Sequence, residues 1–495
     1  MGKKFVVATL FIISCVIFAS EVLAEVKTDA GASFRLRQEI WDNVVDLGTI
    51  GNAAPPGNMD RNYFRFRSSV WGKVDFNKDF GVYMRLTNEP RYHLGPNRFL
   101  NYGRENVAPL ANRYGDNDKF EIDELFIDNL YLDAKDIFGL PVDLRIGRQD
   151  FIGPTGYGEG FLILDGNPGD GSRSFYFNAV KTSIKFAKTN TLDFIYISDR
   201  ETDNWPTAHE AIHNIQTANY RYGKRILNNT AEKAYVVYSK NKFFEKLDVE
   251  PYYIYKTEAP TPGTGTAGTT YASKLRLNTV GARVAYKDGG LKTGVEYAHQ
   301  YGSYTQARTT TTDDGRKRRG NGGYAYAGYQ YANMTFKPEV ELRYVYLSGE
   351  DNTSNTNEGN THTGWNPLFS RAPMWNELII YTLLPETAKD HSPVPGYWSN
   401  MQIYKGSVKL NVSADTNLNV GYSYLRANKT DVGLSTAMYS MRGKDRGNLY
   451  QGVLSHKFNK SLDGFLQYEY FSPGSYYVGA AKNAQFIRWQ LMYKI

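Results

Sequence analysis

The dominant pattern along the chain is an alternation of apolar and polar residues with a period of two. In the segment from Gln485 to Ile495, apolar side chains occupy every second position, and Arg488, Gln490 and Lys494 stand between them. Successive side chains of a strand point to opposite faces, so each such segment has one apolar and one polar face. About eighteen segments follow this pattern, each near the roughly 9 to 11 residues that a tilted strand needs to cross a bilayer. The pattern predicts an all-β protein, a transmembrane antiparallel β-barrel of about 18 strands.

The predicted strands are spread over almost the whole chain. Their centres lie near Leu36, Phe66, Met84, Ile127, Leu144, Ile184, Tyr196, Val237, Tyr253, Val280, Val295, Tyr329, Leu342, Val408, Val420, Leu454, Tyr468 and Gln490. Short connections such as Asn77-Lys78-Asp79 and Asn459-Lys460 contain turn-forming residues, and they alternate with long ones such as Pro90 to Lys119 and Gly349 to Asn400. This alternation predicts short periplasmic turns, long extracellular loops and an even number of strands.

The first residues have a different pattern. Lys3 and Lys4 precede an apolar run from Phe5 to Ala19, and the small-residue sequence Val22-Leu23-Ala24 follows it. This order is typical of a secretory signal peptide, so we expect residues 1–24 to be removed and residues 25–495 to form a single barrel domain. The sequence around Cys15 is similar to a lipoprotein processing box, but the residues after Cys15 stay apolar, which favours the ordinary signal peptide.

Composition agrees with strands that have one apolar and one wet face. The chain contains 39 Tyr, 26 Phe and 46 Gly, yet its mean hydropathy is negative, at -0.51. Its only cysteine is Cys15, so the mature chain has no thiol for a disulfide, a thiolate metal site or a nucleophile. The net charge of +7 is too small for a chain of this length to predict binding of nucleic acid.

The polar alternates predict which charged residues line the pore. If apolar residues face lipid, one nearly contiguous basic wall faces inward, and it consists of Arg35, Arg37, Arg65, Arg67, Arg85, Arg145 and Arg488. Acidic residues are expected mostly across the barrel, with cations between them: Asp248, Glu250, Glu296, Glu339 and Glu341, interleaved with Arg283, Lys292 and Arg343. Guanidinium groups offer paired donors to carboxylates, so such a wall favours anions. Alternatively, the arginines only solvate the lumen or pair with Glu39, Glu89 and Asp143.

Three segments carry a resemblance to a known family. The segments Phe34 to Asn43 and Leu144 to Asp150, together with the Gly-rich stretch Gly153 to Gly160, resemble the alginate-export family of bacterial outer-membrane β-barrel porins. The resemblance extends over essentially the whole mature chain. It implies an eighteen-stranded pore with an electropositive constriction for an anionic polyuronate, and long loops or turns that gate it. It supports Arg35, Arg37 and Arg145 as lumen arginines.

The leading functional hypothesis is a porin in the bacterial outer membrane that gives passive passage to an anionic, alginate-like polysaccharide. The expected partners are outer-membrane lipid, lipopolysaccharide, the anionic solute and periplasmic export proteins.

Anion-selective uptake of small sugar acids or organic acids is one alternative function, and a surface receptor or adhesin is another. An enzyme is not expected, because the chain has no G-x-S-x-G sequence and the strand residues His299 and His456 have no evident nucleophile partner. No catalytic residue, cofactor or metal site is predicted.

Three motifs in the predicted loops compete with this interpretation. The segment His209 to His213 matches H-E-x-x-H, but a loop supplies neither a compact domain nor a clear third ligand, so we interpret it as a solvated loop helix. The segment Asp165 to Gly171 is similar to a calcium loop but lacks the distal glutamate of an EF-hand. The run Arg316 to Arg319 offers a surface for anionic polysaccharide or lipopolysaccharide, although such charge runs are usually only solvated.

Overall fold

The computed structural model describes residues 26–43, 61–94, 119–121, 125–151, 156–159, 176–200, 220–221, 224–225, 231–259, 274–305, 316–349, 361–369, 376–378, 399–430, 442–477 and 481–495. Within these ranges, eighteen strands form the wall of a barrel: β1 (Lys27–Asp42), β2 (Arg61–Asp75), β3 (Phe80–Asn88), β6 (Phe126–Ala134), β7 (Val142–Gln149), β8 (Phe177–Ala187), β9 (Asn190–Asp199), β12 (Ala231–Phe244), β13 (Leu247–Ala259), β14 (Lys274–Asp288), β15 (Leu291–Thr305), β16 (Arg316–Gln330), β17 (Glu339–Leu347), β19 (Met401–Asn411), β20 (Thr416–Arg426), β21 (Asp445–Lys457), β22 (Leu462–Pro473) and β23 (Ala484–Lys494). Each predicted strand centre lies inside one of these strands. The predicted fold class is confirmed.

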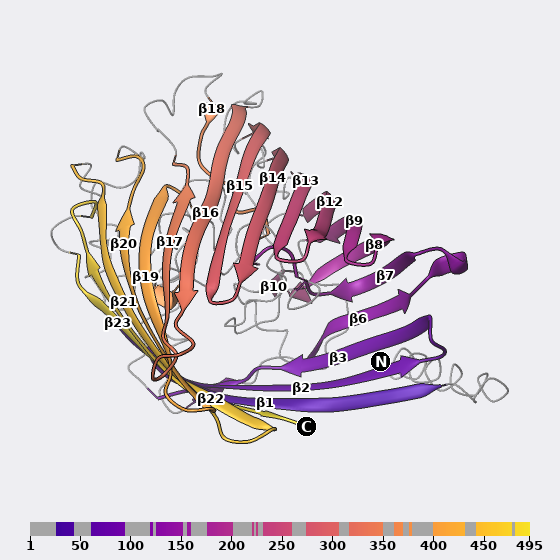
Figure 1. Ribbon diagram of the computed structural model, residues 1–495, viewed down its shortest axis with the longest axis horizontal. Coiled ribbons are helices and arrows are strands. Elements are labelled where there is room, and N and C mark those ends of the chain that lie inside the picture. Colours follow the sequence, from indigo (N-terminus) through magenta and orange to yellow (C-terminus); the bar gives the residue numbers. More distant parts are fainter. Residues whose placement is uncertain are drawn as a thin grey trace.

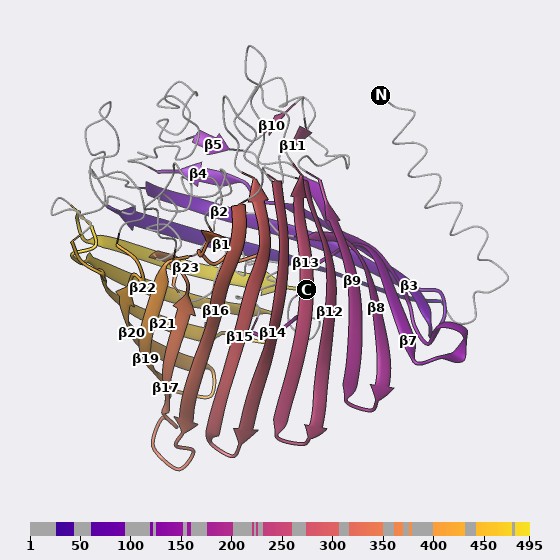
Figure 2. The same ribbon diagram turned by 90° about the horizontal axis from the view of Figure 1, so that it is seen from above.

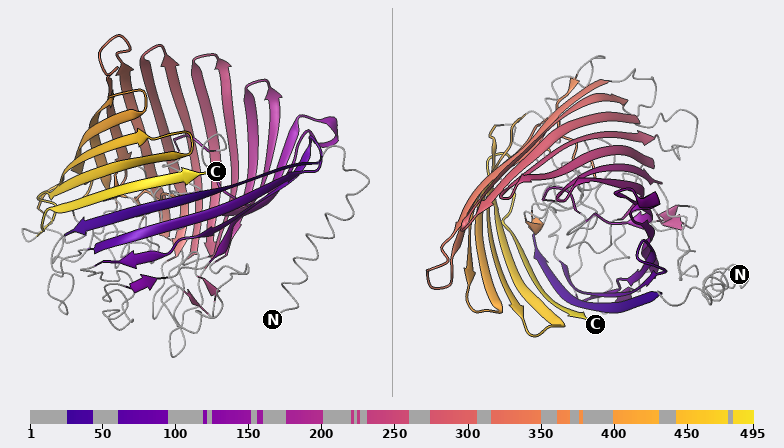
Figure 3. Two further views of the ribbon diagram at one scale, coloured as in Figure 1. Left: turned by 90° about the horizontal axis from the view of Figure 1, so that it is seen from below. Right: turned by 45° about the vertical axis from the view of Figure 1, so that its right-hand side comes forward.

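Neighbouring wall strands are antiparallel, and the first strand pairs with the last. Leu36 of β1 lies opposite Phe66 of β2 on one side and opposite Leu491 of β23 on the other. These two pairings close the ring, which Figure 3 shows where the indigo and yellow strands meet. Figure 1 shows the order of the strands around the wall. Closure leaves the wall without an exposed edge, as a structure that spans a membrane with strands requires.

The short turns lie together at one end of the barrel. Figure 2 shows the hairpins β8–β9, β12–β13, β14–β15 and β16–β17 closing at the same edge. In the turn between β2 and β3, the Asn77 side-chain oxygen accepts hydrogen bonds from the backbone N–H groups of Asp79 and Phe80, both at 2.9 Å. Asn459 does the same for Ser461 and Leu462 in the turn between β21 and β22. Asn stabilises these tight turns because its side chain replaces a backbone acceptor.

The alternation divides the wall into an outer apolar face and an inner polar face. Val280, Val295 and Leu342 are exposed on the outer face, where lipid would cover them. Near the end opposite the short turns, outward tyrosine rings contact one another, with ring centroids 5.0 Å apart for Tyr344 and Tyr404. Such rings form the aromatic girdle expected at a membrane interface. In the part of the chain that the structure describes, no helix is long and apolar enough to cross a membrane.

Five short strands and one helical turn are present besides the eighteen wall strands, and the alternation pattern did not predict them. They are β4 (Arg91–His93), β5 (Lys119–Glu121), β10 (Tyr220–Arg221), β11 (Lys224–Arg225), β18 (Thr361–His362) and the 3-10 turn η2 (Ile137–Gly139). Strand β18 pairs in parallel with the start of β16. It belongs to the long connection between β17 and β19, whose described parts are buried against the inner wall.

Candidate pore site

All eight predicted pore arginines lie on inward-facing positions, and every one of them forms an ion pair. The pairs are Arg35–Glu89, Arg37–Glu39, Arg65–Glu39 and Arg65–Glu89, Arg67–Asp128, Arg85–Asp128 and Arg85–Asp150, Arg145–Asp133, Arg343–Glu159 and Arg343–Glu341, and Arg488–Glu39 and Arg488–Glu377. The lumen is therefore lined by a network of alternating charges and not by a bare basic wall.

Four of these arginines are buried around two carboxylates, Glu39 and Glu89. Glu39 accepts from Arg65 at 2.6 Å and from Arg488 at 3.0 Å, and it also contacts Arg37 at 3.4 Å and the hydroxyl of Tyr63. We call this group, with Arg35 and Glu89 beside it, the Glu39 cluster. All its side chains are nearly inaccessible to solvent. Its arginines therefore hold the wall together and do not touch a passing solute.

The other four arginines, Arg67, Arg85, Arg145 and Arg343, are partly exposed to the lumen. Arg145 donates through Nε and Nη2 to the two oxygens of Asp133, at 2.6 and 2.8 Å. Arg85 bridges Asp128 on β6, at 2.8 Å, and Asp150 just after β7, at 3.1 Å. Arg67, Arg85 and Arg145 lie on β2, β3 and β7, on one side of the barrel, and Arg343 lies on β17 on the opposite side.

The predicted placement of the acidic residues was wrong in part. Asp128, Asp133 and Asp150 stand on the basic wall itself, although Glu250, Glu296, Glu339 and Glu341 do lie on the opposite wall. Asp143 does not pair with a wall arginine, because Lys185 of the next strand reaches it at 2.8 Å. Partners this close are favoured because an unpaired charge in a narrow protein lumen is poorly solvated.

A short segment after β7, residues 156–159, reaches across to the opposite wall. Glu159 binds Arg343 of β17 at 2.9 Å, and the carbonyl oxygen of Gly156 accepts from Lys240 of β12 at 2.5 Å. Tyr157 donates to Asp193 at 2.7 Å. Burial, and after it the nearby carboxylate, raises the pKa of Tyr157 well above its ordinary value, so this hydroxyl stays protonated as a donor. The segment therefore narrows the lumen from one side.

The connection between β17 and β19 narrows the lumen further. The side chain of Gln300 exchanges two hydrogen bonds with the backbone of Asn366, at 2.6 and 2.9 Å. Lys256 donates to the carbonyl oxygen of Leu368 at 2.8 Å. Further along the same connection, Glu377 binds Arg488 at 2.7 Å on β23. One connection therefore contacts two separate parts of the inner wall.

Sequence reasoning missed several residues of this network for local reasons. Strands β3 and β6 shift register between Arg85 and Leu86, which changes the alternation around Asp128. Gly147 adopts φ +130°, and Arg148 and Gln149 after it are both buried, so the period of two ends there. A glycine inside a strand was the available signal for this irregularity. Glu159 and Glu377 come from predicted loops, where no periodicity places a side chain.

Of the three motifs predicted in loops, the structure describes only the basic run Arg316 to Arg319. Residues 209–213 and 165–171 lie outside the described residues. Within the part of the chain that is described, no group of three or more His, Cys, Asp or Glu side chains could hold a metal ion. The basic run was placed wrongly in a surface loop, because residues 316–319 begin β16. Arg318 of this run is buried and faces inward, where it donates to the carbonyl oxygen of Gly364 at 3.3 Å.

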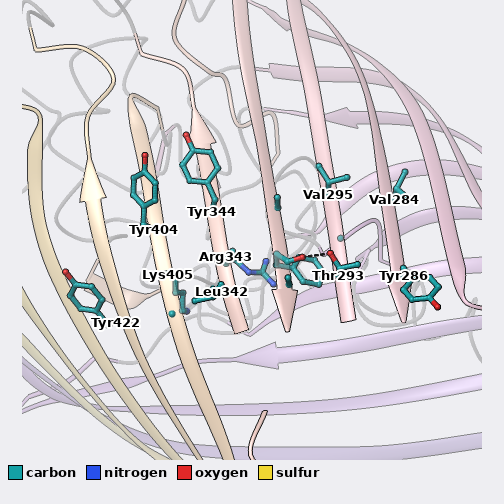
Figure 4. Close-up of a pocket in the computed structure, with 15 residues that line it drawn as sticks. Val284, Tyr286, Thr293, Val295, Leu342, Arg343, Tyr344, Tyr404, Lys405 and Tyr422 are labelled. Atoms are coloured by element: carbon teal, nitrogen blue, oxygen red, sulfur yellow. Dashed lines mark hydrogen bonds between the residues drawn. The ribbon is translucent and has the colours of Figure 1, made fainter. Parts of the chain in front are cut away.

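A shallow groove of about 850 Å³ lies on the outer face of β14 to β20 and takes no part in the pore. It is lined mainly by outward side chains, among them Leu342, Tyr344, Tyr404 and Tyr422 (Figure 4). Small residues such as Gly406 hollow it. Figure 4 also shows Arg343 and Lys405, which are register partners on adjacent strands β17 and β19. An apolar groove at this position faces the lipid.

A closed antiparallel barrel with an apolar outer face, a charged lumen and inward segments that narrow it is the architecture of an outer-membrane porin. The family model for alginate export matches residues 188–489, more than half of the chain. The protein belongs to the alginate-export family, as its sequence predicted. It lies in the bacterial outer membrane, in contact with lipid and lipopolysaccharide, and passes solutes.

Two solved structures are similar in fold. The crystal structure of Acinetobacter baumannii OccAB2 has a TM-score of 0.52 and 10% identity, with 94% of this chain and 98% of that chain covered. Acinetobacter baumannii OccAB1 has a TM-score of 0.51 and 12% identity, with 94% and 96% covered. No curated protein matches the sequence. Identities this low support the fold alone.

Proposed function

We propose that the pore gives passive passage to anionic solutes and that its principal solute is an anionic, alginate-like polysaccharide. Membership of the alginate-export family supports the substrate class. The observation that carries the proposal is the unequal exposure of the ion pairs on β2 to β9. Arg67 is 13% exposed and Arg85 is 19% exposed, whereas their shared partner Asp128 is 0% exposed. Lys181 is 14% exposed and its partner Asp193 is 3% exposed.

This asymmetry gives the wall a positive surface although its charges are paired. Asp128 and Asp193 lie behind their cations, whereas Asp133 and Asp150 are exposed beside theirs, so a solute in the lumen meets more guanidinium and ammonium groups than carboxylates. Charges in water are screened beyond roughly 8 to 10 Å, so the groups that a solute meets directly dominate its interaction with the wall. On β13 to β17 the exposures are balanced, as with Arg283 at 12% and Glu250 at 13%. The preference for anions would therefore arise mainly from the β2 to β9 wall.

A second function of the same pore follows from its narrowing. Residues 156–159, 361–369 and 376–378 occupy part of the lumen, which favours small sugar acids or organic acids over a long polymer. Uptake of such acids therefore stands beside polymer export as a candidate. In either case we propose that residues 1–24 direct export of the chain, that residues 25–495 form one barrel, and that polymer export would need periplasmic partners.

Reconstituted channels are expected to prefer anions, and the Arg85→Gln/Arg145→Gln variant is expected to lose most of this preference. Both changes remove accessible positive charge and leave Asp133 and Asp150 facing the lumen. The measurement is the reversal potential across a planar bilayer in a KCl gradient at low salt. Lys246→Ser is the charge control, because Lys246 lies in a short turn and its ion pair with Asp288 is exposed to solvent. A parent channel without anion preference would refute the proposed function.

A further inference from the structure

Five outward-facing cations form a surface at the end of the barrel opposite the short turns. They lie on three alternate wall strands: Lys233 on β12, Lys274 and Arg276 on β14, and Lys317 and Arg319 on β16. All five side chains are exposed. Each lies an even number of residues from an exposed outward residue of its own strand, which is Tyr235, Val280 or Tyr329, so all five point away from the lumen. We call these five residues the outer basic patch.

Three of these cations lie in one row across five adjacent strands, which Figure 2 shows side by side. The register places Lys233 opposite Thr257 of β13, and Thr257 opposite Arg276. On the other side of β14, Arg276 lies opposite Ser303 of β15, and Ser303 lies opposite Lys317. Since neighbouring strands are roughly 4.8 Å apart, the backbones of successive cations in the row are about 10 Å apart. The row therefore alternates charged side chains with hydroxyl groups.

The outer basic patch differs from the lumen in how its charges are balanced. Every predicted pore arginine is ion-paired, whereas none of the five outer cations forms an ion pair with a residue that the structure describes. Glu232 and Glu258, the carboxylates of β12 and β13 at this level, are buried on the inner face, where they bind Lys256 at 2.9 and 3.0 Å. An exposed surface with such an excess of positive charge attracts anions.

Outward tyrosines lie next to the outer basic patch, on the side toward the short turns. Arg276 is two residues from Asn278, which accepts a hydrogen bond from the hydroxyl of Tyr253 at 2.7 Å. Tyr235 and Tyr301 lie in the same row as Asn278. All three tyrosine rings are exposed on the outer face. Because outward tyrosines mark the boundary between acyl chains and headgroups, the patch lies at the level of the lipid headgroups.

The chemistry and the position of the patch together identify its ligand. The end opposite the short turns is extracellular in such a barrel, and lipopolysaccharide is the phosphorylated lipid of the leaflet there. Arginine and lysine pair strongly with phosphate, and the hydroxyls of Thr257 and Ser303 add donors between them. We propose that the outer basic patch binds the headgroup phosphates of lipopolysaccharide, with the acyl chains of the same molecule lying on the apolar wall beside it.

A lipid fits this surface better than a soluble polyanion does. The patch continues without a break into the lipid-facing wall, where Val280 and Val295 are exposed, and it points sideways into the leaflet. A soluble polyanion would use the charges and leave the adjoining apolar wall unused. The patch also supplies positive charge that Mg²⁺ or Ca²⁺ otherwise provides between the phosphates of neighbouring lipids. Binding should therefore persist when divalent cations are removed.

The test measures how much lipopolysaccharide the folded, full-length barrel retains in detergent with EDTA present, by native mass spectrometry over a range of lipid concentrations. The parent should bind it. In Arg276→Ser/Lys317→Ser/Arg319→Ser the affinity should fall by about tenfold or more, because each basic residue adds a several-fold factor to the attraction for an anionic lipid. Arg276→Lys/Arg319→Lys keeps the charge and should retain most of the affinity.

Lys78→Ser/Lys246→Ser/Lys460→Ser is the matched control, because it removes three exposed cations from short turns at the other end of the barrel. It should bind lipopolysaccharide as the parent does. Equal loss in the two triple variants would overturn the proposal, and so would a parent that retains no lipopolysaccharide in EDTA. Two further outcomes would exclude this ligand: equal binding of lipopolysaccharide whose phosphates have been removed, and displacement of the lipid by an equal concentration of a soluble anionic polysaccharide.

Discussion

The Glu39→Ala variant is expected to lose about 3 to 5 kcal/mol of folding free energy, because it leaves buried guanidinium groups without their shared carboxylate. Arg65 and Arg488 bind the same oxygen of Glu39, at 2.6 and 3.0 Å, and all three side chains are almost fully buried. Water cannot solvate these cations without opening the wall between β1, β2 and β23. The measurement is the urea midpoint of unfolding in detergent, followed by the mobility shift of heated and unheated protein on a gel.

Glu339→Ala is the control for this prediction, because it also removes an ion-paired carboxylate but from an exposed position. Glu339 also pairs with a cation, Lys292, but both side chains are substantially exposed in the lumen. Glu339→Ala is expected to change stability by about 1 kcal/mol or less, as for other exposed ion pairs. Equal destabilisation by the two substitutions would show that the Glu39 cluster is not the main determinant of stability in this part of the wall.

The Glu39 cluster links the wall to the segment that narrows the pore. Arg488 binds Glu39 through Nη2 and Glu377 through Nη1, and Glu377 belongs to the connection between β17 and β19. The backbone N–H groups of Glu377 and Leu378 donate to Glu469 of β22, at 3.1 and 2.9 Å. These buried, charged hydrogen bonds therefore fix residues 377–378 against the inner wall. An apolar contact would fix them less precisely, because it has no preferred direction.

The fold was predictable because a barrel exposed to lipid has to repeat one simple pattern. Lipid requires apolar residues such as Val280, Val295 and Leu342 at alternate positions, and the turn ends require residues such as Asn77. Each of these signals is local in the sequence. The direction of Arg35, Arg37, Arg65 and the other five arginines could therefore be predicted from their neighbours alone.

How deeply each of these arginines is buried, and which carboxylate it pairs with, could not be predicted from the sequence. Whether Arg65 is buried and Arg145 accessible depends on segments that enter the lumen from distant parts of the chain, and on carboxylates such as Glu377 that these segments bring. The stacking of Tyr83 on Tyr131 was missed for a related reason. Tyr83 and Tyr131 stack only because the register between β3 and β6 places them opposite each other. Register between strands is a property of pairing and cannot be read from either strand alone.

The Gly322→Val variant is expected to raise the single-channel conductance by about twofold or more, because a wide barrel conducts freely once its lumen is cleared. Gly322 of β16 faces inward, and the indole ring of Trp365 packs directly on it; an added Cβ would lie 2.6 Å from that ring. Trp365 is fully buried, so it cannot move aside without displacing the segment 361–369 from the wall. The backbone pairing of Gly322 with Leu347 tolerates valine, which is favoured in strands.

Gly452→Val is the matched control for this experiment. Gly452 lies in β21 between the outward residues Tyr450 and Leu454, and an added Cβ there would meet no atom within 4 Å. The same side chain is thus added to a wall strand on the lipid side, and the conductance should stay at the parent value. If Gly322→Val also leaves the conductance unchanged while the barrel folds normally, the segment around Trp365 does not limit the flow of ions. The narrowing would then have to lie at Glu159 and its contact with Arg343, and Glu159→Ala would be the variant that widens the pore.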